Sequence, residues 1–281
     1  MIYGGAMKKI LTLVAVAAMS FSLFGLDIFN YVQINGNVKN YTQIDYDIGS
    51  KFGNYTRTPV LKTITMLDNS GRAVEMTELS ARDAILNKTT SKYDVYGNLI
   101  EQTCYDADSK LLWRDVVTYN NGQKADSSEY DKNGSLRSKI IYAYAEGKLS
   151  EETGYDGDGA LIWKIIYKYN PAGKIADTFE YSADGSLETQ ETYTYLDDGK
   201  IESLVTFNAF TGETTRKVFR YAANATLSEI TTYDEAKQVT NRLIIKYDAG
   251  GNVSKVSEYN VAQKFGTTVN ELVEMSEYSY Q

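Results

Sequence analysis

The side chains in this sequence that could do chemistry are aromatic rings and carboxylates. The chain of 281 residues contains 24 Tyr, 2 Trp and 37 Asp plus Glu, but no His. Without an imidazole there is no Ser-His-Asp or Cys-His site, no histidine metal ligand and no histidine pH switch. Aromatic rings can stack on sugars or on apolar partners, and paired carboxylates can hydrolyse glycosides. Binding and carboxylate catalysis are therefore the two chemistries that stay open.

The two tryptophans are the first binding candidates because they occupy equivalent places. Trp113 and Trp163 each lie eight residues after a tyrosine of a repeated series. On one face of a sheet with neighbouring tyrosines, they would stack on a sugar ring or on the apolar edge of a protein partner. The alternative is that these aromatic rows only hold the sheet together. The candidate binding residues are Trp113, Trp163, Tyr119, Tyr144 and Tyr169.

Carboxylate chemistry is the weaker possibility. Glu151 and Glu152 are adjacent, so in a strand they point to opposite faces and do not form a glycosidase pair. Carboxylate pairs across neighbouring strands stay open. The corner Asp156-Gly-Asp158-Gly159 lacks the further acidic ligands of a calcium loop, which favours a simple turn. We therefore expect a protein that is not an enzyme and has no metal or cofactor.

Charge and cysteine content exclude further classes. The formal net charge of −8 opposes binding to nucleic acid, which requires clustered Lys and Arg. Cys104 is the only cysteine, so an intramolecular disulfide, a CxxC redox pair and a zinc thiolate cluster are impossible. Because this cysteine lies far from the N-terminus, a lipid anchor through cysteine is not expected either.

The N-terminal residues have the features of a secretory signal. Two lysines precede an apolar run from Ile10 to Phe24, and small residues stand at Ser20 and Ser22. The run is short for a membrane helix and no other segment approaches 18 apolar residues, so we expect no integral helical span. The protein is predicted to be exported to the periplasm, the outer surface or the extracellular medium.

Tyrosines also reveal an internal repeat of 25 to 26 residues. After most of these anchors come Asp, Asn or Ser, then Gly and an aliphatic residue, which is the composition of a β-hairpin corner. Each anchor is therefore predicted to end a strand. The first series is Tyr93, Tyr119, Tyr144, Tyr169, Tyr195, Tyr221 and Tyr247, and between its members lie Tyr105, Tyr130, Tyr155, Tyr181, Phe207, Tyr233 and Tyr259.

The period extends backward and divides the chain. Leu67-Asp-Asn-Ser-Gly71 is a divergent corner, so residues 73–87 are predicted to be strand with a corner near 80–83, despite their helical propensity. Asn35-Gly36, flanked by alternating residues, predicts a two-residue hairpin. The expected organisation is a signal peptide at 1–22, N-terminal capping hairpins at 23–66, hairpin repeats at 67–259 and C-terminal capping strands at 260–281.

Strand alternation separates an aromatic face from a charged face. Trp163, Tyr167 and Tyr169 share the aromatic face. The alternation places four carboxylates on the same face: Glu101, Asp126, Glu151 and Glu229. The other face is predicted to carry Arg114, Arg137, Lys139, Lys164, Lys168, Arg216, Arg220, Arg242 and Lys246 together with Glu129, Glu152, Glu180, Glu202 and Glu258.

The prediction is an all-β fold: an extended antiparallel β-meander of about fourteen strands, in a single-layer or gently coiled sheet of tandem hairpin repeats. The aromatic face is too polar for the core of a sandwich. An outer-membrane barrel is the rival geometry, but it needs an apolar lipid-facing band, and the segment from Lys124 to Tyr130 offers none.

The corners beginning at Tyr93, Tyr130 and Tyr247 resemble the YD repeats of bacterial RHS-type proteins, over about residues 93–259. This resemblance implies a β-sheet shell that can enclose a toxin, and carbohydrate binding or surface attachment. The architecture also resembles that of spirochaete surface proteins with a free-standing sheet. The predicted function is that of an exported structural or adhesive protein that binds a glycan, or an envelope or host protein, over its aromatic face. The alternatives are a secreted glycan-active enzyme that uses carboxylates and a shell fragment of a toxin-delivery system.

Overall fold

The computed structural model describes residue 29 and residues 31–51, 54–264 and 266–281, so the predicted signal peptide lies outside the described residues. Every regular element in the described part is a β-strand. The strands are β1 (Asn40–Lys51), β2 (Asn54–Leu67), β3 (Ala73–Ser80), β4 (Ile85–Tyr93), β5 (Leu99–Asp106), β6 (Leu111–Asn120), β7 (Gln123–Asp131), β8 (Leu136–Ala145), β9 (Lys148–Asp156), β10 (Leu161–Tyr169), β11 (Ile175–Ser182), β12 (Leu187–Tyr195), β13 (Ile201–Asn208), β14 (Thr214–Tyr221), β15 (Leu227–Tyr233), β16 (Val239–Tyr247), β17 (Val253–Lys264) and β18 (Thr267–Tyr280).

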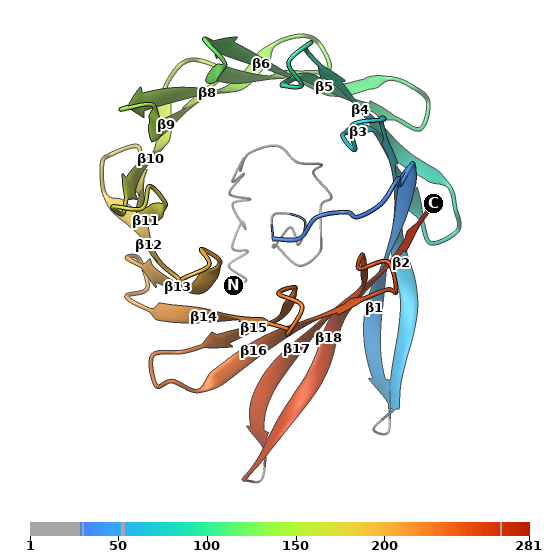
Figure 1. Cartoon of the computed structure of the whole chain (residues 1–281). Coiled ribbons are helices and arrows are strands. Elements are labelled where there is room, and N and C mark those ends of the chain that lie inside the picture. The colour runs from blue at the N-terminus through green and yellow to red at the C-terminus, as the bar shows by residue number, and fades with distance from the viewer. Residues whose placement is uncertain (1–28, 30, 52–53, 265) are drawn as a thin grey trace, which may run out of the picture.

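The sheet closes on itself as an antiparallel barrel of 18 strands (Figure 1). Each strand pairs with its neighbours in sequence, and β1 also pairs with β18, from Tyr41 opposite Tyr280 to Asp47 opposite Glu274. The predicted all-β meander is correct, but the open, single-layer sheet is wrong. A twisted meander closes when its first and last edges meet, and closure removes both unpaired edges.

Most strand boundaries follow the tyrosine anchors as predicted, but Tyr259 lies inside β17 (Val253–Lys264) and does not end a strand. The strands β4, β10, β12 and β16 end at Tyr93, Tyr169, Tyr195 and Tyr247. Residues 73–80 and 85–93 are strands, as the repeat predicts, and the corner between them holds Asp83 at a φ of 60°. The predicted hairpin at Asn35-Gly36 is wrong, because residues 31–39 contain no strand.

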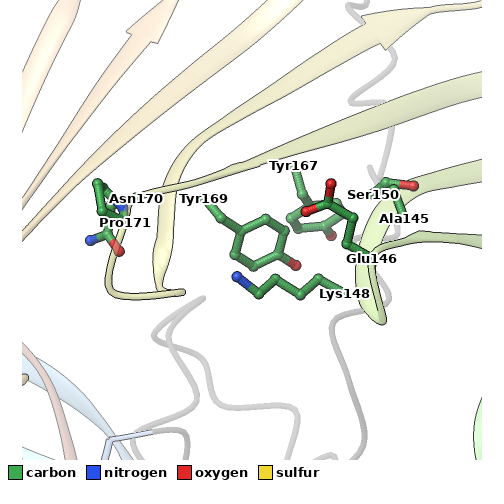
Figure 2. A pocket seen from close by; sticks show the side chains of 8 residues that line it. All are labelled: Ala145, Glu146, Lys148, Ser150, Tyr167, Tyr169, Asn170 and Pro171. Atoms are coloured by element: carbon green, nitrogen blue, oxygen red, sulfur yellow. The ribbon is translucent and has the colours of Figure 1, made fainter.

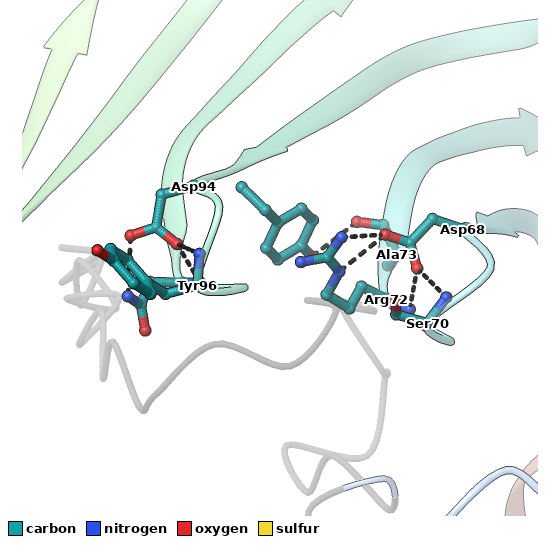
Figure 3. Close-up of polar contacts among 8 residues, drawn as sticks. Asp68, Ser70, Arg72, Ala73, Asp94 and Tyr96 are labelled. Carbon is teal, nitrogen blue, oxygen red and sulfur yellow. Dashed lines mark hydrogen bonds and ion pairs between the residues drawn. The ribbon is translucent and has the colours of Figure 1, made fainter. Parts of the chain in front are cut away.

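An aspartate organises most corners, as Figure 3 shows at Asp68 and Asp94. Asp68 Oδ1 accepts hydrogen bonds from the backbone N–H groups of Ser70 (2.8 Å) and Arg72 (3.0 Å). The backbone N–H of Gly71 donates to the carbonyl of Asp68, and Gly71 has a φ of 76°, which a glycine adopts without strain. The repeated Tyr-Asp-x-x-Gly sequence therefore produces the same tight corner from unit to unit.

A segment that precedes β1 identifies the face that lines the barrel. This segment, here called the strap (Phe29 and residues 31–39), runs inside the ring of strands in Figure 1. Its Tyr31 ring lies 5.4 Å from the ring of Phe219 on β14, and its Phe29 ring lies 5.3 Å from that of Tyr41 on β1. Side chains that share a face with Phe219 and Tyr41 therefore form the inner wall.

The inner wall carries a buried apolar sector on β13 to β18, and Phe29, Tyr31 and Val32 of the strap pack against it. This apolar sector is the main hydrophobic core of the described residues. Its buried members are Leu204, Phe219, Leu227, Ile230, Leu243, Ile245, Val253, Val256 and Tyr278.

A β-bulge beside most corners corrects the predicted faces. At the first of the repeated corners Lys92 pairs with Glu101 while Tyr93 pairs with Leu99, so one residue of β5 has no partner. Such an extra residue reverses the alternation of the short strand relative to simple counting from the anchor. Glu101, Asp126, Glu151 and Glu229 are therefore on the outer wall, and Glu129, Glu152, Glu180 and Glu258 are on the inner wall, the opposite of the prediction.

The bulges also place the two tyrosine series on opposite walls. The first series faces inward, and its hydroxyl groups donate to backbone carbonyls 20 residues earlier, for example Tyr195 to Ile175 (2.7 Å) and Tyr221 to Ile201 (2.9 Å). The second series faces outward beside basic residues, with Tyr130 opposite Arg114 and Tyr259 opposite Arg242. Each of these inward bonds links an even-numbered strand to the strand before it, along one rim of the barrel.

We expect Tyr195→Phe to lower the free energy of unfolding by about 1 kcal/mol, because it removes one buried hydrogen bond without changing the ring. Urea unfolding followed by circular dichroism measures this change. Tyr96→Phe is the control, because it makes the same chemical change in a corner where the ring is 87% exposed. A loss equal for both variants would contradict a special role for the tyrosine bond.

Candidate functional site

The interior of the barrel is the candidate site. Eighteen strands at the usual spacing and tilt enclose a barrel with a radius of roughly 15 to 18 Å at the backbone, and barrels of this strand number leave an aqueous lumen. The strap and the apolar sector occupy the side formed by β13 to β18. The adjoining wall, on β8 to β12, carries polar and aromatic side chains.

Tyrosines and carboxylates meet on this wall. The hydroxyl of Tyr167 donates to Glu152 Oε1 (2.8 Å), and the hydroxyl of Tyr193 donates to Glu191 Oε2 (2.6 Å). We call the inward-facing group on β8, β9, β10 and β12 the tyrosine–carboxylate patch. It comprises Tyr142, Glu152, Tyr167, Glu191 and Tyr193.

Burial shapes the ionisation of the patch. The pKa of Glu152 is raised by burial, while its bond from Tyr167 and the charge of Lys124 act in the opposite direction. Burial likewise lowers the pKa of the Lys124 ammonium, which lies over the ring of Tyr142 at 5.4 Å from its centre. The wall thus already binds one ammonium group by the cation–π interaction.

Carboxylates on the two walls have different partners. On the outer wall they pair with basic side chains: Glu101 contacts Lys92 (2.6 Å) and Arg114 (2.5 Å), and Glu229 contacts Arg242 (2.9 Å). On the inner wall the described carboxylates are mostly bonded to neutral donors, and Glu129 is the member with an ion pair. The inward set is Asp45, Glu78, Asp115, Glu129, Glu152, Glu180, Glu191, Glu258 and Glu274.

A cavity of about 470 Å³ lies beside the patch, at the rim of the barrel that carries the first tyrosine series (Figure 2). Tyr167 and Tyr169 line it together with Lys148, whose ammonium lies 5.2 Å from the centre of the Tyr169 ring. Figure 2 shows this lysine extended beside the ring. Arg72, Lys174 and Lys200 stack on other tyrosines of this rim in the same way, so basic side chains recur along the rim of the barrel.

The predicted binding residues lie on the inner wall but do not form one site. Trp113 and Tyr119 are on β6, Tyr144 is on β8, and Trp163 and Tyr169 are on β10. Of these residues, the cavity contains Tyr169. The predicted open aromatic face is thus the lining of a barrel.

The tryptophans fill equivalent packing positions opposite small residues. Trp163 pairs with Gly154 and Trp113 pairs with Cys104. A Cβ atom added at Gly154 would lie 2.3 Å from Trp163 Cε2, so the indole covers this glycine. Cys104 is buried and carries a free thiol whose pKa is raised by burial.

Sequence analysis missed Glu152 and Glu191 as site residues. The prediction placed Glu152 on the charged face because counting from the anchor ignores the bulge. The signal that could have found it is the corner itself, since a turn closed by glycine is commonly followed by a bulge.

In the described part of the chain no group of three or more His, Cys, Asp and Glu side chains is arranged to hold a metal ion. Residues 29, 31–51, 54–264 and 266–281 include no helix long and apolar enough to cross a membrane.

Comparison with solved structures finds two porin-like proteins at low sequence identity. A porin-like protein from Bacteroides uniformis is 12% identical, with 88% of this chain and 99% of that chain covered and a TM-score of 0.49. A porin-like protein from Bacteroides vulgatus is 11% identical, with 75% and 98% covered and a TM-score of 0.42. No family model and no curated protein matches the sequence.

A Photorhabdus luminescens Tc holotoxin pore structure is 11% identical over 76% of this chain, with a TM-score of 0.17, and this chain spans 20% of that chain. The predicted relationship to YD-repeat shells is wrong, since the chain closes as an 18-strand barrel. The likeness to a free-standing spirochaete sheet fails for the same reason. An adhesive role over an extended aromatic face is also wrong, because that face lines the barrel. The two alternative functions, a secreted glycan-active enzyme and a shell fragment of a toxin-delivery system, are not retained either.

Proposed function

We propose that this protein is an exported barrel of the cell envelope that binds small organic ammonium compounds in its lumen. The observation that carries the proposal is the difference between the walls. Outer carboxylates are neutralised by Lys and Arg, whereas Glu152 and Glu191 are bonded to tyrosine hydroxyl groups beside aromatic rings.

The chemistry of the patch suits an ammonium ligand. Tyrosine faces attract a cation, and carboxylates provide charge-assisted hydrogen bonds to N–H groups. Lys124 over Tyr142 and Lys148 over Tyr169 are examples of ammonium groups held on this wall. A polyamine or a quaternary ammonium compound carries the same group.

The outer wall favours an aqueous location over a lipid-embedded one. It bears Lys88, Lys92, Arg114, Lys139, Lys164, Arg220 and Arg242, several of them in ion pairs. A Lys or Arg that faces lipid near the bilayer midplane costs about 2 to 4 kcal/mol. The predicted secretion signal directs the barrel to the envelope, and these charges keep its wall in water.

A cation-selective channel in the outer membrane is the second candidate. The even strand number and the wide lumen favour it, because bacterial outer-membrane barrels have even numbers of antiparallel strands. It requires the outer-wall ion pairs to be accommodated away from lipid. Fractionation without detergent and single-channel recording in planar bilayers separate the candidates: soluble protein without conductance supports the first, and regular conductance steps support the second.

We expect Glu152→Gln to weaken spermidine binding by about tenfold, equivalent to about 1.4 kcal/mol. Isothermal titration calorimetry of the mature protein measures this affinity at pH 7.5. Glu151→Gln is a matched control, because Glu151 is the next residue, faces outward and pairs with Lys164 (3.1 Å). Because the pKa of Glu152 is raised, affinity should fall as the pH is lowered.

Equal effects of the two substitutions would contradict the assignment of the site to the inner wall. Citrate serves as the anionic probe. If citrate binds as tightly as spermidine, or neither binds, the proposed ligand class is wrong.

A further inference from the structure

The apolar sector is a separate feature that ammonium binding does not use. It lies on β13 to β18, next to the tyrosine–carboxylate patch on β8 to β12 (Figure 1), and Tyr193 of the patch packs against its edge. Its members project into the interior, where a polar wall would suit water better. Leu227, Val253 and Val256 are each at most 2% exposed, so something covers them.

Aromatic and aliphatic side chains of the strap rest on this sector. Phe29 meets Tyr278 edge to face with ring centres 5.7 Å apart, and Tyr31 lies against Phe219 at 5.4 Å. Val32 packs on the same cluster. Such contacts are those that an aromatic ligand of similar size would make.

The strap is held by side-chain contacts at this end and by a clamp at the other. The backbone N–H of Asn35 donates to Asn252 Oδ1 (2.6 Å), and Asn252 Nδ2 donates to the carbonyl of Asn35 (3.2 Å). Asn35 Nδ2 also donates to the carbonyl of Gly251 (2.9 Å). Residues 31–39 form no strand, and the backbone bonds that continue the barrel's ladder begin at Lys39, which bonds to Gln281 and Leu67.

We propose that the apolar sector is a binding site for uncharged aromatic molecules, and that the strap fills it as a tethered competitor. A short tether gives a segment an effective concentration of the order of millimolar. The apparent affinity of a ligand for the same surface is therefore the intrinsic affinity multiplied by the fraction of molecules in which the strap has left the surface.

The probe is N-phenyl-1-naphthylamine, an uncharged dye whose fluorescence rises in apolar surroundings. In the full mature protein, Phe29→Ser with Tyr31→Ser is expected to tighten dye binding by about tenfold, because it weakens the competitor and leaves the sector intact. Val38→Ser is the matched control, since Val38 belongs to the strap but is not among the residues packed on the sector.

A second route tests the same idea from the barrel side. Asn252→Ala removes two of the three clamp bonds without touching the strap's aromatic residues, and it too should tighten dye binding if the strap competes. A synthetic peptide of residues 29–36 should displace the dye from the double variant. Thermal melts of each variant show that the barrel is folded.

The proposal is overturned if neither variant binds the dye more tightly than the parent, or if the peptide fails to displace the dye. Dye binding is measured without spermidine, because Tyr193 of the tyrosine–carboxylate patch packs against the sector. Failure of spermidine binding would therefore leave this result unchanged, and the two proposals can fail separately.

Discussion

Replacing Gly154 with valine is expected to destabilise the barrel by about 3 kcal/mol, because overpacking at this position displaces the Trp163 indole. The added Cβ alone would lie 2.3 Å from Trp163 Cε2, far inside van der Waals contact. The two residues are direct cross-strand partners, so the indole has no room to shift along the strand. Urea unfolding followed by far-ultraviolet circular dichroism measures the loss.

The control for this prediction is a double-mutant cycle. In a Trp163→Ala background the valine fills the space that the indole leaves, and its cost should fall by at least about 1 kcal/mol. Strictly additive costs would show that the glycine is required for another reason, such as its backbone conformation.

Replacing Asp115 with asparagine is expected to stabilise the barrel at pH 8 by about 2 to 4 kcal/mol and to change its stability little below about pH 4. Burial, and then the charge of Glu129, raise the pKa of Asp115 to about 7, while Arg137 acts in the opposite direction. The side chain is 8% exposed, and its Oδ1 has no hydrogen-bond partner.

The sign follows from the raised pKa. An unfolded aspartate ionises near pH 4, whereas the folded one keeps its proton until about pH 7, so the folded state is favoured at low pH and loses this advantage as the pH rises. Asparagine keeps the neutral form throughout. Thermal melts between pH 5 and pH 8 should show a steeper decline for the parent than for the variant.

Asp126→Asn on the outer wall is the comparison for Asp115→Asn. Asp126 contacts Lys139 (3.6 Å), so its replacement should not raise stability at pH 8. A gain of the same size from both substitutions would indicate a general effect of net charge.

Strand positions were predictable from this sequence, because the anchors and the corner glycines recur at fixed spacing. Closure was not, because nothing local in the repeat distinguishes β1 and β18 as partners. The rejected barrel rested on the absence of a lipid-facing band, yet that absence argues against membrane insertion and not against closure. The segment from Lys124 to Tyr130 is polar in the structure and still forms a barrel strand.

The candidate site was predictable only in part. Aromatic residues were correctly placed on one wall in the long strands, where alternation from the anchor holds. The acidic partners were misplaced in the short strands, because one extra residue at each bulge reverses the facing of Glu152 relative to Glu151. A site that depends on both strand types therefore could not be assembled by counting alone.

The pairing of β1 with β18 also constrains the order in which the molecule is completed. Hairpins from β2 to β17 can form as soon as each new strand is available, but the contact between Asp45 and Ser276 spans 231 residues. One edge of β1 stays unpaired until β18 has been synthesised. A chain that stops short of β18 is left with two open edges, which pair readily with other chains or are recognised by proteases. A completed barrel therefore requires that β18 has been made and has paired with β1.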